Sequence, residues 1–372
     1  MNRKKLIAFS LSLAMTVVPV TPAAAGAEQN TEGLQNAVLD LEFENSLEDS
    51  SGKGNNGTLS SGEAEYVDGV VGKGLKMNGS SYVNLGNSTD LQPENLTLSF
   101  WIRPDSDMKG EELLSWNKNE WYTDGWYLSS ENDNTPLTLS VGPAKANGQP
   151  YRVSVSGKRS EFLPTGEWTH IAVTYDKDSK EICFYRNGVK CSTVTTYGIS
   201  GESTGVLGSD ATMEKSIGYN GPKYKGAYLK ASLDEYQLYN AVATPEEVIA
   251  LYEESGQTFD RKAVAQADLD KISIPETTQE NLSLPTTGES GSVISWSSDN
   301  EAVVAADGTV VRPGVGEKDV TVTLTAEASY LNGEKVTKTY KVTVTAKQEI
   351  NITTSSIMGD VTLEDDYLVN AA

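Results

Sequence analysis

The sequence predicts an all-β chain of two β-sandwiches of unequal size, and three observations support this fold class. Short alternating apolar and polar runs, separated by Gly, Asn, Asp and Ser clusters, fill residues 37–239. A second set of such runs fills residues 267–346. The first helical period appears only at "TPEEVIALYEESG", and a nearly all-β pattern with one terminal helix favours a sandwich.

The N-terminal segment 1–27 is typical of a secretory signal peptide. A basic region at Asn2–Lys5, with Arg3, Lys4 and Lys5, precedes an apolar run at Leu6–Val18, and Ala23–Ala27 contains two A-x-A cleavage patterns. No later stretch is long and apolar enough to span a bilayer. We therefore expect a secreted, extracellular protein and exclude this segment from the fold.

The charge of the chain limits its partners. Its 372 residues carry a formal net charge of −22 at pH 7. Because such an acidic surface repels nucleic acids and anionic lipids, we expect neither as a partner. Neutral and cationic ligands remain, and neutral glycans belong to this set.

Two strands of the larger domain have a clear inward face. The pattern predicts that one side of each strand is buried, with the inward residues Leu96, Leu98, Phe100 and Ile102 in "NLTLSFWIRP" and Ile171, Val173 and Tyr175 in "EWTHIAVTYD".

The predicted helix has signals at both ends. Thr244 is placed to cap it, Pro245 takes the first helical position, and Glu247 completes a capping box. Gly256 ends the helix.

The two cysteines, Cys183 and Cys191, flank Arg186-Asn187-Gly188, a hairpin turn signal. A two-residue Asn-Gly turn pairs Cys183 with Ser192 and puts the thiols on opposite faces. A three-residue loop pairs Cys183 with Cys191 directly. We favour the second register, with a cross-strand disulfide, because exported cysteines so placed usually oxidise.

With these strands in order, residues 37–256 resemble the laminin-G-like jelly roll of the concanavalin A-like lectin/glucanase superfamily. The resemblance is carried by "LEFENSLEDSSGKGNNGTL", "LKMNGSSYVNLG", "LTLSFWIRP", "EWTHIAVTYD", "CFYRNGV" and "LDEYQLYNAVATPEEVIALY". It implies a jelly-roll β-sandwich. It says little about function, because the fold hosts lectins, enzymes and spacers.

Beyond a linker at 257–266, residues 267–346 resemble an atypical bacterial immunoglobulin-like domain, through "LSLPTTGESGSVISWSSDNEAVVAADGTVVRPGVGEKDVTVTLTA". Such modules commonly accompany catalytic domains of secreted glycan-degrading enzymes. The tail at 347–372 is similar, in "GDVTLEDDYLVNAA", to the opening of a β-L-arabinofuranosidase catalytic domain. We therefore expect the tail to begin a further domain.

No catalytic site is recognised in this chain. Asp40, Glu42 and Glu44 are placed to share one face of a strand, but their order and N-terminal place differ from the acidic pair of concanavalin-like glucanases. His170, the only histidine, stands where the jelly-roll family usually has a structural residue. Without a paired nucleophile or metal-ligand cluster, we expect no catalysis from it.

One structural calcium ion is a possibility that the family resemblance raises. Laminin-G-like jelly rolls often bind calcium where the N-terminal loop meets the C-terminal strand. The resemblance gives Asp49, Asn55 and Asp234 as ligands, and oxygen-rich, Gly-rich loops suit this cation. The alternative is that Asp234 simply accepts backbone N–H groups.

The candidate sugar-binding residues are Trp121 and Tyr122, with Asn119 and Asp124 beside them in the same loop. Aromatic faces stack on the C–H surfaces of sugars, and Asn and Asp supply hydrogen bonds. Tyr224 in "GYNGPKYKG" is placed to line the same end of the sandwich, together with Tyr219 and Asn220. Ordinary packing of these rings is the alternative.

Three functions stay open. We favour a non-catalytic carbohydrate-binding or targeting region that binds a plant or microbial polysaccharide and belongs to a secreted glycoside hydrolase, with a β-L-arabinofuranosidase as the candidate. The second is a structural or adhesive cell-surface protein. The third, a concanavalin-like glucanase, is disfavoured because it needs two facing carboxylates about 5–5.5 Å apart.

Overall fold

The computed structural model describes residues 34, 36–105, 112–118, 125–130, 132–142, 151–191, 194–197, 214–219, 228–352 and 367–371. The predicted signal peptide lies outside these ranges. None of the helices within them has the length and apolar character needed to cross a bilayer.

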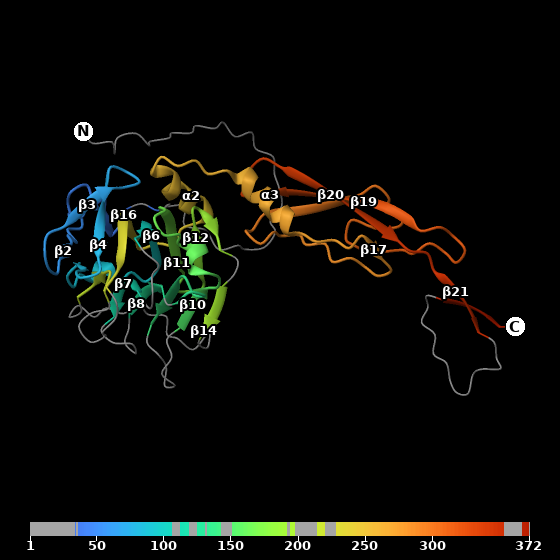
Figure 1. The fold of residues 1–372 in the computed structure, drawn as a ribbon, viewed down its shortest axis with the longest axis horizontal. Helices are drawn as coiled ribbons and strands as arrows, with labels where there is room; N and C mark the ends of the chain where they lie inside the picture. Colours follow the sequence, from blue (N-terminus) through green and yellow to red (C-terminus); the bar gives the residue numbers. More distant parts are fainter. Residues whose placement is uncertain are drawn as a thin grey trace, which may run out of the picture. The chain divides into compact units, whose positions relative to one another are not determined.

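The larger domain is built from two antiparallel sheets in two layers (Figure 1). The described strands of the first sheet follow the order β13 (Val189–Lys190), β12 (Ile182–Arg186), β11 (Thr169–Tyr175), β6 (Leu96–Pro104), β16 (Lys230–Tyr239), β4 (Lys73–Asn78) and β3 (Glu65–Asp68), with β1 (Leu39–Leu41) also paired to β16.

The second sheet forms the other layer of the domain and packs face to face with the first. Its described strands follow the order β14 (Val194–Tyr197), β10 (Tyr151–Val155), β9 (Thr138–Val141), β8 (Gly125–Ser130), β7 (Glu112–Lys118), β15 (Ser216–Ile217), β5 (Val83–Asn84) and β2 (Thr58–Leu59). Two short helical turns, η1 (Thr89–Leu91) and α1 (Arg159–Phe162), lie in the connections from β5 to β6 and from β10 to β11, which join the two sheets.

The main core lies between the two sheets, where alternation along each strand places the apolar residues. Every residue predicted to face inward on β6 and β11 is buried there, namely Leu96, Leu98, Phe100, Ile102, Ile171, Val173 and Tyr175. They meet Leu128, Leu139 and Val153 of the second sheet in the same cluster. The predicted fold class, a jelly-roll sandwich with a smaller immunoglobulin-like domain, is confirmed.

The outer face of the first sheet is covered by α2 (Pro245–Glu254). Thr244 and Glu247 form the predicted capping box, and Pro245 takes the first turn. Val248 packs on Ala172 and Tyr185, so this face of the sheet is apolar as well.

The second domain has one four-stranded sheet among its described residues, in the order β17 (Thr277–Thr278), β20 (Val336–Val344), β19 (Val320–Ser329) and β18 (Val293–Ser298). Its apolar side is covered by α3 (Arg261–Lys271) and by Leu282 and Val304. Two parallel strands, β21 (Gln348–Ile352) and β22 (Tyr367–Ala371), follow.

The helix α3 occupies most of the expected linker at residues 257–266. Asp260 caps it by accepting a hydrogen bond from Ala263 N. Buried Asp268 accepts hydrogen bonds from Ser290 N and Ser292 N at 2.9 and 3.2 Å. This carboxylate therefore ties the turn before β18 to the helix.

Candidate functional site

Of the sugar-binding residues predicted from the sequence, Tyr219 lies within the described residues. The others lie outside them, namely Asn119, Trp121, Tyr122, Asp124, Asn220 and Tyr224. Their role stays a prediction.

The second sheet has an unusual face on the side away from the core. Its residues, called here the polar face, are Tyr127 and Ser129 of β8, Thr138 and Ser140 of β9, and Arg152 and Ser154 of β10. They alternate with core residues, and the strand register pairs Tyr127 with Ser140 and Ser140 with Arg152. Because cross-strand partners point to the same side, these side chains form adjacent polar rows.

The hydroxyl groups of the polar face are not fully paired. Thr138 Oγ1 and Ser154 Oγ are 2.7 Å apart and share a hydrogen bond. Ser129 Oγ and Ser140 Oγ are buried and have no hydrogen-bond partner in the part of the chain that the structure describes. A buried unpaired hydroxyl costs about 1–3 kcal/mol, so these two groups are suited to a polar ligand or ordered water.

The same row continues toward the other edge of the sheet. Trp116 of β7 pairs through its backbone with Tyr127 and with Ser216 of β15, and Ser216 pairs with Asn84 of β5. Tyr82 stands two residues before Asn84 and so points to the same side. It stacks on Tyr219, with ring centroids 5.1 Å apart.

The predicted calcium ligands are held by protein donors. Asp49 accepts hydrogen bonds from Asp40 N, Ser51 N, Ser51 Oγ and Asn55 N at 2.8–2.9 Å. Burial alone would raise the pKa of Asp49, but these bonds together lower it. These hydrogen bonds therefore stabilise the negative charge of the Asp49 carboxylate without a cation.

Asp234 accepts hydrogen bonds from backbone N–H groups, as the alternative to calcium binding predicts. Its Oδ2 accepts hydrogen bonds from Val70 N and Val71 N at 2.7 and 3.0 Å, and Oδ1 accepts one from Glu235 N. Burial nevertheless raises the pKa of Asp234 to about 6. Burial, followed by the charges of Asp234 and Asp40, raises that of Glu235 to about 8. A cation beside Asp234 and Glu235 would lower the pKa of both carboxyl groups.

Calcium stays a prediction. In the described ranges, no group of three or more His, Cys, Asp or Glu residues is arranged to hold a metal. The residues nearest to such a role are Asp234 and Glu235, next to a β-bulge in β16.

The acidic N-terminal strand is shorter than the sequence pattern predicts. The strand β1 ends at Leu41, and positive φ values at Phe43 and Asn45 turn the chain away. Asp40 is buried and accepts a hydrogen bond from Gln237 Nε2 at 3.3 Å. The three acidic residues therefore do not line one strand face as expected.

His170 is a core residue. Its Nε2 lies 2.9 Å from Ser99 Oγ, and its ring is packed by Trp101 and Tyr252 at 5.2 and 5.7 Å. The side chain is 1 % exposed, and burial lowers its pKa to about 3. A neutral imidazole closed off from solvent has no substrate to act on.

The predicted disulfide is wrong, and the reason is the hairpin turn. Arg186 pairs with Val189, and Cys191 N donates to Phe184 O at 2.8 Å. Asn187 and Gly188 have φ values of 49° and 79°, as a two-residue type I′ turn requires. Cys191 therefore lies opposite Phe184 rather than Cys183, and both cysteines are free.

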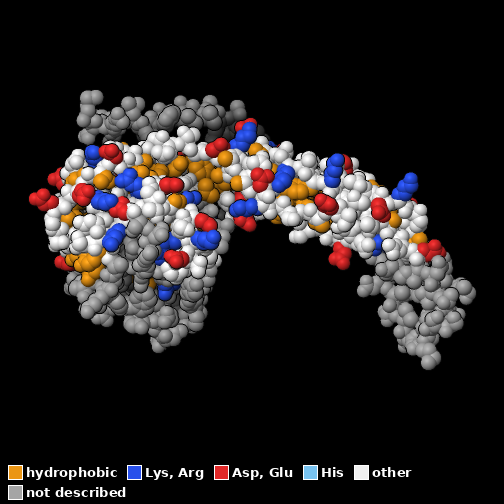
Figure 2. Space-filling model, in the orientation of Figure 1, with side chains coloured by type: hydrophobic (Ala, Val, Ile, Leu, Met, Phe, Trp, Pro, Cys, Tyr) orange, Lys and Arg blue, Asp and Glu red, His pale blue; other side chains and the backbone are white. Residues whose placement is uncertain are grey.

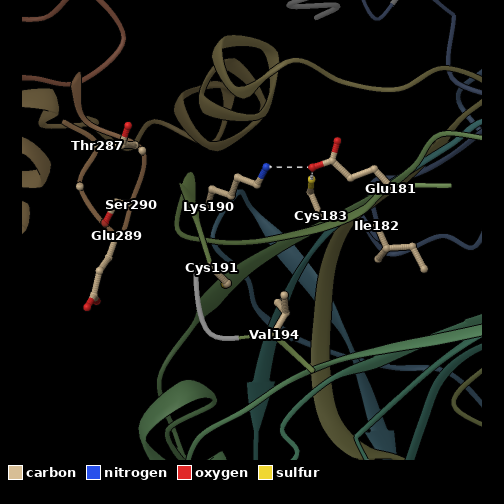
Figure 3. Close-up of a pocket in the computed structure, with 11 residues that line it drawn as sticks. Glu181, Ile182, Cys183, Lys190, Cys191, Val194, Thr287, Glu289 and Ser290 are labelled. Atoms are coloured by element: carbon tan, nitrogen blue, oxygen red, sulfur yellow. Dashed lines mark hydrogen bonds and ion pairs between the residues drawn. The ribbon is translucent and has the colours of Figure 1, made fainter. Parts of the chain in front are cut away.

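A pocket of about 420 Å³ lies beside this hairpin (Figure 3). Glu181 Oε1 accepts hydrogen bonds from Lys190 Nζ and Cys183 Sγ at 3.2 and 3.1 Å. Burial raises the pKa of both thiols, that of Cys191 to about 12. The thiols are therefore protonated at neutral pH, and the pocket offers no thiolate for catalysis or metal binding.

Comparisons with known proteins agree with the two domains. Residues 77–249 match the family model of the concanavalin A-like lectin/glucanases superfamily, and residues 262–347 match that of the atrophied bacterial Ig domain. The chain therefore carries a concanavalin A-like domain followed by an immunoglobulin-like domain, which confirms the resemblance of both.

One curated relative is an α-L-arabinofuranosidase of Bifidobacterium longum subsp. longum, 36% identical over 126 residues. The match covers 27% of this chain and 12% of the relative's length. The resemblance of the tail to a β-L-arabinofuranosidase stays a prediction.

Two solved structures are similar at low identity. Domain 4 of AbnA, an extracellular GH43 arabinanase from Geobacillus stearothermophilus in complex with arabinotriose, is 23% identical with a TM-score of 0.42, over 58% of this chain and 98% of that chain. The binding domain of Paraclostridial Mosquitocidal Protein 1 is 19% identical with a TM-score of 0.46, over 79% and 64%.

The polar face is not recognisable from the sequence alone. Its residues lie in segments such as "GWYLSS" and "TLSV", whose serines and threonines have no special spacing. An alternation of Ser and Thr with apolar residues on three successive strands was the available signal. It becomes informative only when the register places the hydroxyl groups in adjacent rows.

Proposed function

We propose that the chain is the non-catalytic carbohydrate-binding region of an exported glycoside hydrolase, with an arabinofuranosidase as the first candidate for the parent enzyme. The observation that carries the proposal is the polar face, whose adjacent rows of polar side chains lead to the partly exposed residues Arg152 and Asn84 at its two ends. The similarity to an arabinofuranosidase supports the parent enzyme.

The charge of the protein supports a neutral ligand. The formal net charge is −22, and Lys and Arg side chains stand among Asp and Glu on the described surface shown in Figure 2. A neutral polysaccharide pays no electrostatic penalty on approaching such a surface, whereas an anionic one is repelled.

The described acidic residues support a binding role rather than a catalytic one. The best-placed carboxyl groups, Asp234 and Glu235, belong to the first sheet, whereas the polar face belongs to the second. A glycosidase needs both carboxyl groups at the sugar. We therefore place the cleavage chemistry outside the domains described above.

The test is binding of the compact unit Leu34–Ala372 to a panel of neutral plant and microbial polysaccharides. Affinity electrophoresis and pull-down on insoluble polymers measure it. We expect binding to at least one neutral polymer and none to polygalacturonate. No binding to any member would reject the proposal and favour a structural or adhesive protein.

A pair of variants connects the binding to the polar face. Arg152→Ala removes a partly exposed guanidinium group at one end of the polar face, and the loss of its hydrogen bonds to the sugar should weaken binding about fivefold. Arg261→Ala, a partly exposed arginine of the second domain, is the matched control and should leave binding unchanged. Unaltered affinity in Arg152→Ala would place the sugar elsewhere.

We further propose a structural calcium ion at Asp234, with Asp49 and Asn55 as the other predicted ligands. The support is the position of Asp234, a fully buried carboxyl group that adjoins Glu235 at the β-bulge of β16. Thermal unfolding with millimolar CaCl2 and with EDTA tests it, and Asp234→Asn should abolish any difference. An equal Tm in both buffers would reject calcium.

Secretion is proposed from the predicted signal peptide at residues 1–27. Expression of the whole chain in a secreting bacterial host, followed by N-terminal sequencing of the protein in the medium, tests it. We expect a first residue after Ala25 or Ala27. An intact N-terminus on a protein retained in the cells would reject secretion.

A further inference from the structure

Three tyrosine rings meet at the β5–β15 end of the second sheet. Tyr219 lies 5.1 Å from Tyr82 and 4.5 Å from Tyr228, and Tyr82 lies 6.5 Å from Tyr228, measured between ring centroids. The three rings are within 10–25° of parallel. All three are partly exposed.

Hydrogen bonds hold the chain segments that carry Tyr82 and Tyr219. Tyr82 exchanges bonds with Ser60, through Tyr82 N to Ser60 Oγ at 3.0 Å and Ser60 N to Tyr82 O at 2.9 Å. Ser216 Oγ donates to Tyr219 O at 2.7 Å. These bonds fix the backbone at Tyr82 and Tyr219, and the two rings stack on each other.

The third ring is fixed by its neighbour in the chain. Tyr228 precedes Leu229, which is fully buried and whose N–H donates to Gly218 O at 3.0 Å. Gly218 has a φ of 86°, and a Cβ there would lie 2.8 Å from Met77 Cε. A glycine is therefore needed where the chain turns from Ile217 to Tyr219.

The three tyrosine rings lie next to one end of the polar face. Tyr82 lies two residues before Asn84, the residue that ends the row running from Arg152 through Ser140 and Tyr127. Arg152 and Tyr82, at opposite ends, are both partly exposed. The middle of the row is buried, so the tyrosines are an accessible part of this face.

We propose that Tyr82, Tyr219 and Tyr228 form a stacking platform for a sugar ring of a neutral polysaccharide, at one end of the polar face. This inference rests on the proposed function and adds its ligand subsite. The C–H face of a neutral sugar ring stacks on an aromatic ring, and rings held in place before binding lose little entropy. The phenol groups supply hydrogen bonds at the ring edge.

The charge beside the platform selects among sugars. Burial and the nearby carboxylate of Glu214 raise the pKa of the Tyr82 hydroxyl, so this group stays a neutral donor. The same carboxylate repels uronic acids and sulfated sugars. Lys215, the neighbouring cation, is buried and donates to Asn87 O at 3.1 Å.

The length of the row sets the size of the ligand. Five strand spacings of about 4.8 Å separate β10 from β5, which gives about 24 Å between Arg152 and the tyrosines. A ligand that uses both ends must be an oligosaccharide. Affinity should therefore rise with chain length and then reach a plateau.

The experiment is calorimetric titration of the unit Leu34–Ala372 with oligosaccharides of increasing length, cut from the neutral polysaccharide that the wild-type protein binds. We expect Tyr219→Ala to weaken binding of the longest oligosaccharide about tenfold, and Tyr219→Phe to change it less than about twofold. Tyr228→Ala repeats the test from another segment. Tyr66→Ala, a partly buried tyrosine of the first sheet, is the matched control.

The outcomes separate this inference from the proposed function. Wild-type binding that persists unchanged in both Tyr219→Ala and Tyr228→Ala would overturn the platform and leave the binding function standing. Failure of the wild type to bind any neutral polysaccharide would overturn both. Equal losses in Tyr66→Ala would show general damage to the fold and would also overturn the platform.

Discussion

The buried histidine leads to a prediction about stability at acidic pH. His170 is the only histidine of the chain, and burial lowers its pKa from 6.5 to about 3. Its ring faces Ser99, Trp101 and Tyr252, none of which carries a charge at these pH values. The folded protein therefore keeps this imidazole neutral where the unfolded chain protonates it.

The sign and the size follow from proton linkage. Above pH 6.5 both states hold the neutral imidazole, so the histidine adds no pH dependence. Below it the unfolded chain binds one more proton, and stability falls by about 1.4 kcal/mol per pH unit. Between pH 7.5 and pH 5 this amounts to about 2 kcal/mol, and the loss continues toward pH 3.

The assay compares urea unfolding of the wild type and His170→Gln at pH 7.5, 6 and 5. Glutamine can still bond to Ser99 but does not titrate, so all other groups cancel in the difference between the two proteins. The stability advantage of the wild type should shrink by about 2 kcal/mol between pH 7.5 and 5. A difference that is the same at all three pH values would refute the buried neutral histidine, as would an imidazole NMR signal that titrates near 6.5.

Three further predictions follow from particular contacts. Cys183 and Cys191 should both react with Ellman's reagent after unfolding, and neither should react quickly in the native protein, because burial raises the pKa of both thiols. Asp268→Ala should lower the free energy of unfolding by about 2–3 kcal/mol, because two backbone N–H groups lose their buried acceptor. Thr244→Ala should cost about 1 kcal/mol by removing the cap of α2.

Each of these has a simple control or contrary result. A native protein without free thiols after denaturation would mean that the disulfide forms and that the hairpin has the other register. Asp270→Ala, at an exposed position on the same helix, should change stability by less than about 0.5 kcal/mol. For Thr244, Thr244→Ser should keep the cap and the stability, and equal losses in both variants would contradict the capping role.

Local patterns determined much of the fold. Alternation in "NLTLSFWIRP" identified the buried residues from Leu96 to Ile102, because a strand with one face on a core repeats every two residues. The cap and first turn of α2 were predictable for a similar reason, since Thr244, Pro245 and Glu247 interact within one turn of helix. By contrast, α3 was missed because its sequence "RKAVAQADLDK" is polar, and only Ala265, Asp268 and Leu269 are buried.

The hairpin shows where local patterns become ambiguous. Both a two-residue and a three-residue turn suit Arg186-Asn187-Gly188, and they differ by one residue of register. Such a shift moves every side chain to the other face. The choice depended on the positive φ values at Asn187 and Gly188 and on the separate apolar surroundings of the two cysteines.

By itself, the sequence determined the all-β class, the two domains' family resemblance, the buried faces of the main strands and the acidic net charge. These depend on neighbouring residues or on composition. Only the tertiary structure decided the polar face and the contact among Tyr82, Tyr219 and Tyr228. Their residues come from strands and loops that are far apart in the chain. Cross-strand register and sheet order bring them together, and the packing of the whole domain sets both.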